Sequence, residues 1–203
     1  MLPFARLNLR WNPFGEVPAR HRGRLAVVGF ELEQVAAQLS EPGFALQLLG
    51  ECGRGKSTHL HALHARFPNM PVTYVDVGAR PRIPRAPLVF IDESQHLTAR
   101  ARRRLFRRRA SFVLATHVCH ADELAAAGHR VETFRVGGVD EDRVREMVAR
   151  RLEWARLGPG PLPAIPDALL RELAAEHGDD LRGLGDALYD WIQARKRQIN
   201  GVL

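Results

Sequence analysis

The sequence predicts an α/β fold, in which a parallel-sheet core is followed by a small C-terminal subdomain of three helices. Five short, almost continuously apolar runs are separated mostly by helical stretches, as expected of parallel strands that are buried on both faces. After Gly138 the pattern contains helices alone. We therefore expect an N-terminal arm at 1–24, an α/β core at 25–138 and a helical lid subdomain at 139–203.

The core elements follow from apolar spacing. A helix over 31–39 is predicted because Leu32, Val35, Ala36 and Leu39 repeat at helical intervals. The five strand candidates are 45–49, 72–77, 88–91, 112–115 and 131–136. Three prolines within 78–87 leave no room for a helix between the second and third strands.

Beyond the core, helices are predicted over 140–156, 167–177 and 180–196, with breaks at the glycines and prolines between them. In the arm, Trp11 and Phe14 are candidate anchors to the rest of the chain.

The composition argues against membrane-spanning, secreted and disulfide-rich classes of protein. The 203 residues are 45% hydrophobic, which is sufficient for a core, and no apolar run approaches the roughly 20 residues of a membrane span. Met1 is not followed by the apolar stretch of a secretory signal. Two cysteines are too few for a disulfide framework. We expect a cytoplasmic protein with no membrane association.

One loop matches the phosphate-binding pattern G-x-x-x-x-G-K-[ST] at every fixed position, between an apolar strand and a helix. Glycines allow consecutive backbone N–H groups to turn toward phosphates, and the helix N-terminus adds partial positive charge. Lys56 is expected to reach the β- and γ-phosphates, and the Ser57 hydroxyl to hold Mg²⁺. The predicted ATP-binding residues here are Gly50, Glu51, Cys52, Gly53, Arg54, Gly55, Lys56, Ser57 and Thr58.

A second motif lies 36 residues downstream of Lys56, where the apolar run 88–91 ends in Asp92 and Glu93. Acids at the carboxyl end of such a strand face the edge where open α/β sheets bind ligands. Asp92 is expected to support Mg²⁺ together with Ser57. Glu93 is expected to orient or deprotonate the water that attacks ATP.

The order of these motifs, followed by a polar-ended strand and a helical tail, resembles the AAA+ ATPases over roughly 25–196. The resemblance implies an adenine-side element around Val28, a sensor 1 residue at Thr116, an arginine finger at Arg130 and a sensor 2 arginine at Arg182. His117 competes with Thr116 because strand ends shift easily by one residue. Residues 91–97 most resemble AAA+ ATPases of origin recognition, transposition and secretion.

Two related functions fit less well. Ring-shaped unfoldases carry substrate-threading elements in the region that 78–87 occupies here without a helix. Transporter-type ATPases need a long helical insert with an L-S-G-G-Q signature between the two motifs, and only about 30 residues separate Thr58 from Leu88.

A run of arginines follows the second motif. Residues 98–109 contain seven arginines and no acid. The charge of this run therefore equals the net charge of the whole chain, which is +7. On a helix, one stripe would hold Arg100, Arg103, Arg104 and Arg107. Because like charges at this spacing repel, a nucleic-acid backbone is a plausible partner. An acidic protein or a solvated face are the alternatives.

The sequence thus predicts an ATP-binding and ATP-hydrolysing switch whose nucleotide state controls assembly into homo-oligomers or grip on DNA or a partner protein. The alternative hypothesis is an ATP-dependent adaptor that hydrolyses little ATP and is recognised by a partner enzyme.

Overall fold

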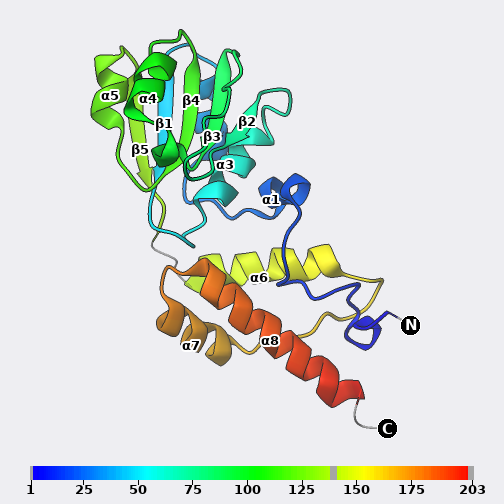
Figure 1. Cartoon of the computed structure of the whole chain (residues 1–203). Coiled ribbons are helices and arrows are strands. Elements are labelled where there is room, and N and C mark those ends of the chain that lie inside the picture. The colour runs from blue at the N-terminus through cyan, green and yellow to red at the C-terminus, as the bar shows by residue number, and fades with distance from the viewer. Residues whose placement is uncertain (1, 138–140, 201–203) are drawn as a thin grey trace. The chain divides into compact units, whose positions relative to one another are not determined.

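The computed structural model describes residues 2–137 and 141–200 (Figure 1). The chain divides into two compact units. The core unit is Arg22–Gly137, and the helical unit consists of the described parts of Met1–His21 and Gly138–Leu203. The two units are treated separately below.

The core unit contains one five-stranded sheet in the order β2-β3-β4-β1-β5, and every neighbouring pair is parallel. This confirms the predicted α/β class. The strands are β1 (Phe44–Leu49), β2 (Val72–Tyr74), β3 (Leu88–Asp92), β4 (Ser111–Thr116) and β5 (Arg130–Arg135). All five fall on the predicted apolar runs, and β1 lies between β4 and β5, so the carboxyl ends of the central strands share one edge.

Helices cover both faces of this sheet (Figure 1). Phe44, Leu46 and Leu48 of β1 pack in one apolar cluster with α2 (Leu32–Leu39) and α3 (Lys56–His64). Ala45 belongs to the opposite cluster, with α4 (Ala99–Phe106) and α5 (Ala121–Ala126). Alternation along a pleated strand sends successive side chains to opposite faces. The continuous burial of β1 therefore reflects two separate apolar layers.

Strand β2 is shorter than the predicted 72–77. It pairs with β3 alone, at the edge of the sheet, and the chain leaves the ladder soon after Tyr74, so that Val77 is 83% exposed. No helix lies between β2 and β3, as the prolines of this segment predicted. The short helix α1 (Ala19–Leu25) leads into the core unit, and Gly23 allows its close approach to α3, since a Cβ there would lie 2.5 Å from the His61 carbonyl oxygen.

The helical unit contains α6 (Glu141–Ala155), α7 (Asp167–His177) and α8 (Leu181–Asn200). Residue 140, the predicted start of the first helix, lies outside the described residues. Its core combines residues of α6, α7 and α8, such as Val148, Leu170 and Leu188, with side chains from the first fourteen residues.

The N-terminal residues are thus packed into this unit, which differs from the extended arm expected over 1–24. A short 3-10 turn, η1 (Ala5–Leu7), is followed by a bridge from Leu9 to Arg156. The Arg10 backbone N–H donates to the carbonyl oxygen of Ala155 at 2.8 Å. The anchors are apolar: Phe14 is buried, and the Trp11 ring meets Trp154 edge-on with ring centroids 5.1 Å apart. Burial of Phe14 and the ring contact of Trp11 fix a segment that has little regular structure of its own.

Within residues 2–137 and 141–200, no helix combines the length and apolar character needed to cross a membrane.

Candidate nucleotide-binding site

The glycine loop joins the carboxyl end of β1 to the N-terminus of α3. Gly53 and Gly55 have φ of 80° and 91°, in the left-handed region that favours glycine. Gly50 is required for another reason, because a Cβ at this position would lie 2.5 Å from the carbonyl oxygen of Val136. The loop therefore has the backbone that a phosphate cradle needs, directly before a helix N-terminus.

Lys56 extends into this loop as a buried cation. Its side chain is only 5% exposed, and its Nζ donates to the backbone oxygen of Glu51 at 2.9 Å and contacts His117 Nε2 at 3.3 Å. Burial lowers the pKa of the Lys56 ammonium, and the nearby carboxylates of Glu93 and Asp92 oppose that shift. A desolvated ammonium of this kind gains most when an anion enters the loop.

Asp92 closes the opposite side of the site. It is 5% exposed, and its Oδ1 accepts from the Glu93 backbone N–H at 3.1 Å, while the Ser57 side chain lies close enough to lower its pKa. Burial raises the pKa of Asp92, and this larger effect is partly offset by Ser57.

The pair formed by Ser57 and Asp92 fits Mg²⁺, which typically takes one or two protein oxygens and fills its other positions with phosphates and waters. In the described part of the chain, no group of three or more His, Cys, Asp or Glu side chains could hold a metal by itself. The donor set therefore favours a cation that arrives together with a nucleotide.

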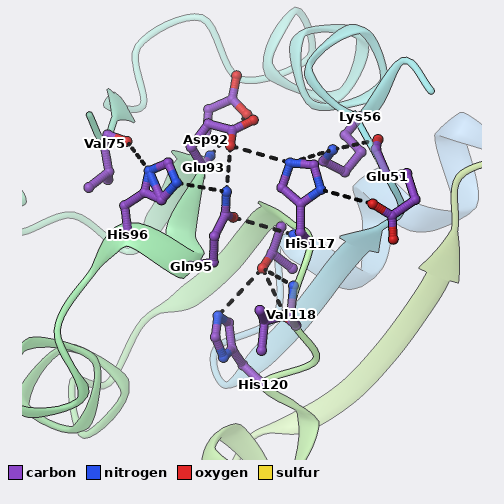
Figure 2. Close-up of polar contacts among 11 residues, drawn as sticks. Glu51, Lys56, Val75, Asp92, Glu93, Gln95, His96, His117, Val118 and His120 are labelled. Atoms are coloured by element: carbon purple, nitrogen blue, oxygen red, sulfur yellow. Dashed lines mark hydrogen bonds and ion pairs between the residues drawn. The ribbon is translucent and has the colours of Figure 1, made fainter. Parts of the chain in front are cut away.

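Glu93 adopts an unusual backbone conformation. Its φ is 58°, one of two non-glycine residues with positive φ among those described, a conformation that costs about 1 kcal/mol or more. The side chain accepts from Gln95 Nε2, and its Oε2 lies 3.5 Å from His117 Nε2 (Figure 2). This backbone geometry brings a partly buried carboxylate beside Lys56.

At the end of β4, the geometry favours His117 over Thr116. Thr116 is fully buried, and its hydroxyl donates to the Val118 carbonyl oxygen at 2.8 Å and accepts from the Val118 N–H at 3.0 Å. The His117 ring instead faces the glycine loop, where Nδ1 lies 3.9 Å from Glu51 Oε2 (Figure 2). The sensor role expected of Thr116 stays a prediction; its hydroxyl bonds within a local turn, whereas the ring of His117 faces the loop.

His59 is a site residue that the sequence reasoning did not single out. It is almost fully buried on α3, with Nδ1 2.9 Å from the carbonyl oxygen of Gly55 and Nε2 3.4 Å from the backbone N–H of Gly29. The Gly29 N–H can only donate, so Nε2 accepts and Nδ1 carries the proton toward Gly55. The ring thereby ties the segment containing Val28 to the glycine loop. Nothing in the sequence distinguishes it from the neighbouring His61 and His64.

The predicted arginine finger, Arg130, does not join this cluster. Arg130 begins β5 opposite Phe44, the first residue of β1, so the length of β1, roughly 17 Å, separates it from the loop. Its side chain is 58% exposed and pairs with Glu41 at 3.3 Å. Arg182 is exposed on α8 in the helical unit, where its backbone N–H donates to Asp180 Oδ1.

The arginine run of 98–109 sorts into two groups. Arg102 forms a bidentate pair with Glu123 and donates to the Leu97 carbonyl oxygen at 2.7 Å, while Arg108 donates to the carbonyl oxygens of Ile83 and Pro84. These two hold α4 in place. The other five arginines of the run are exposed, and we call four of them the arginine surface: Arg100, Arg103, Arg104 and Arg107, with Arg109 left out of this set.

No protein-family model and no curated protein sequence matches this chain. Solved structures share its fold at low identity. NtrX from Brucella abortus, solved in complex with ADP, aligns with a TM-score of 0.56 and 13% identity, covering 87% of this chain and 54% of the NtrX chain. A point variant of RuvB from Thermotoga maritima aligns with a TM-score of 0.53 and 14% identity, covering 89% of this chain and 68% of the RuvB chain.

This chain therefore shares the fold of the NtrX and RuvB chains. This chain spans about half of the NtrX chain, with 54% covered. At these identities the likeness concerns the fold, and the chemistry must be argued from the residues of this chain.

Proposed function

We propose that this protein binds and hydrolyses ATP and acts as a nucleotide-dependent switch. The observation that carries the proposal is the convergence of buried Lys56 and Asp92 with Glu93 on one glycine loop. Buried charges are costly unless they are paired or have a ligand. A loop with this backbone, a desolvated ammonium and two adjacent acids matches what a nucleoside triphosphate requires.

In this mechanism, the backbone N–H groups around Gly53 and Gly55 and the Lys56 ammonium bind the phosphates and offset charge that develops during transfer. Ser57 and Asp92 would hold Mg²⁺, which neutralises phosphate oxygens when bound. Glu93 orients the attacking water and accepts its proton. His117, beside Lys56 and Glu93, takes the sensor position at the end of β4.

Arg130 serves this site only through assembly. Arg130 lies at the amino end of its strand, so it cannot reach the glycine loop of the same chain. To act as an arginine finger it must therefore reach the glycine loop of a second copy of the chain. Arg182 belongs to the helical unit and is proposed to meet the γ-phosphate as a sensor. Either arrangement couples hydrolysis to assembly or closure.

The partner proposed for the switch is a nucleic-acid backbone bound to the arginine surface. The charge extends beyond α4: Arg85, from the proline-rich loop, and Arg104 both lie close enough to Arg108 to lower the pKa of its guanidinium, after the larger effect of burial. Clustered cations without acids are favourable when phosphates screen them. With no motif for reading bases, the contacts are mostly to phosphates.

The decisive experiment combines calorimetry with a steady-state ATPase assay. Wild-type protein is expected to bind ATP and to turn it over in Mg²⁺. Glu93→Gln should bind ATP with similar affinity and hydrolyse it ~100-fold or more slowly, the scale of a lost general base. Equal turnover by the variant and the wild type would remove Glu93 from this role.

The second candidate function is an adaptor that binds ATP but hydrolyses little. The assay separates the two if it is repeated with DNA and RNA present. Binding of ATP without turnover in any of these conditions favours the adaptor.

A further inference from the structure

A single amide joins the carboxyl ends of three neighbouring strands. Gln95 lies in the short 3-10 turn η2 (Ser94–His96) directly after β3. Its Nε2 donates to Glu93 Oε2 and lies 3.4 Å from His96 Nε2, and its Oε1 accepts from the His117 backbone N–H at 3.3 Å (Figure 2). His96 Nδ1 in turn lies 3.2 Å from the carbonyl oxygen of Val75.

The partners fix the orientation of this amide. A backbone N–H can only donate, so the oxygen of Gln95 must face His117. The amide NH₂ then faces the Glu93 carboxylate, which accepts. His96 completes the pattern, because a proton on Nδ1 satisfies Val75 and leaves Nε2 to accept from Gln95. Each hydrogen-bonding group of Gln95 therefore has a partner of the opposite kind.

We propose that Gln95 is a positioning residue that couples Glu93 to His117, an inference that rests on the proposed function. His117 Nε2 contacts Lys56 Nζ at 3.3 Å and Glu93 Oε2 at 3.5 Å. A γ-phosphate that reaches Lys56 competes with His117 for the ammonium. The amide of Gln95 then passes a shift of the His117 backbone to the carboxylate of Glu93, in addition to the direct contact of the ring.

The strained backbone of Glu93 explains why such support is needed. With φ at 58°, its side chain direction depends on partners as well as on local preference. Gln95 and His117 both engage the same oxygen, Oε2. Loss of the amide should leave Glu93 present but poorly aimed, and misplacement by about 1 Å costs on the order of 100-fold in rate.

The test uses Gln95→Met, which keeps approximate shape and removes every hydrogen bond. We expect the Kd for ATP to change by less than about 3-fold and kcat to fall roughly 10- to 100-fold. Gln95→Glu retains the acceptor for His117 and loses the donor to Glu93, so it should also lose turnover. Gln34→Met, on the exposed side of α2, is the matched control. Wild-type turnover in Gln95→Met would overturn the proposal.

A double-mutant cycle separates positioning from general damage. If Gln95 acts through Glu93, Gln95→Met should change the residual rate less than about 2-fold in a Glu93→Gln background. An equal loss in both backgrounds means a structural role and contradicts the inference.

A readout without turnover keeps this inference separate from the proposed function. Hydrogen exchange of the His117 backbone amide should accelerate at least about 10-fold in Gln95→Met, whether or not ATP is hydrolysed, because its acceptor is lost. Unchanged exchange at His117 contradicts the coupling. Failure of the wild type to bind ATP instead contradicts the proposed function.

Discussion

The glycine loop and the arginine surface both concentrate charge within the core unit, but the charges are buried at the loop and exposed on the arginine surface. Around the loop, Lys56 and Asp92 are buried and bonded to neighbouring groups. On α4, the four residues of the arginine surface are exposed. Buried, fixed charges suit one small ligand of defined shape, whereas exposed like charges suit a flexible polyanion that makes many weak contacts. Each prediction below perturbs one region and uses the other as its reference.

The largest expected effect is at the loop. Lys56→Ala should weaken ATP binding at least ~100-fold, because it deletes the ammonium that is buried against the glycine loop. Isothermal calorimetry measures this directly. Arg107→Ala, an equal charge change on the arginine surface, should leave ATP affinity within about 2-fold. Undiminished ATP affinity in Lys56→Ala would remove the basis for the nucleotide site.

The same variant tests Arg130. If Arg130 acts on a neighbouring copy, turnover per chain should rise with protein concentration, and Arg130→Ala should lose most of it. A mixture of Arg130→Ala with Lys56→Ala should recover part of that loss, since one chain supplies the loop and the other the arginine. Concentration-independent turnover without recovery would assign Arg130 a surface role, consistent with its pairing to Glu41.

An intermediate effect is expected on the arginine surface. Replacing Arg100, Arg103, Arg104 and Arg107 together with Gln should weaken DNA or RNA binding and reduce the slope of log affinity against log salt by up to about four. Gln keeps a helix propensity close to that of Arg. Fluorescence anisotropy across a salt series measures the slope, and ATP binding should be unaffected.

The control removes the same charge elsewhere, by changing Arg20, Arg171, Arg195 and Arg197 to Gln, all exposed and remote from α4 in sequence. Its salt slope should stay near that of the wild type. An equal decrease in both quadruple variants would mean that net charge alone drives binding. If the wild type binds no nucleic acid at low salt, with or without nucleotide, an acidic protein or solvent faces the arginine surface and the adaptor function gains support.

The smallest effect is one of stability. Because burial raises the pKa of Asp92, the folded protein binds a proton there more tightly than the unfolded chain, and the ionised form costs stability at neutral pH. Asp92→Asn should therefore raise the melting temperature of nucleotide-free protein by roughly 1–3 °C. In calorimetric scans, the difference in melting temperature between Asp92→Asn and the wild type should decrease as the pH falls, because the wild-type carboxyl then takes up its proton. The exposed Asp190→Asn should show no comparable gain, and a lower melting temperature in Asp92→Asn would contradict this account.

Much of the fold could be predicted because its signals are local. Short, mostly apolar runs located all five strands, and helical spacing located α2 and the three helices of the helical unit. Prolines in 78–87 predicted a connection without a helix. The packing of the N-terminal residues could not be predicted in this way, since Phe4 and Phe14 find their partners on α6 to α8, more than a hundred residues along the chain.

For the candidate site, the glycine loop and the acids at the end of β3 follow from the sequence by itself, because each is a contiguous motif whose chemistry requires its spacing. Only the tertiary structure decided that His117 rather than Thr116 faces the loop, that His59 and Gln95 support it, and that Arg102 and Arg108 are anchors. Two physical reasons account for these cases. A one-residue step along a strand reverses the direction of a side chain, and the order β3-β4-β1 brings together residues whose distance along the chain gives no sign that they meet.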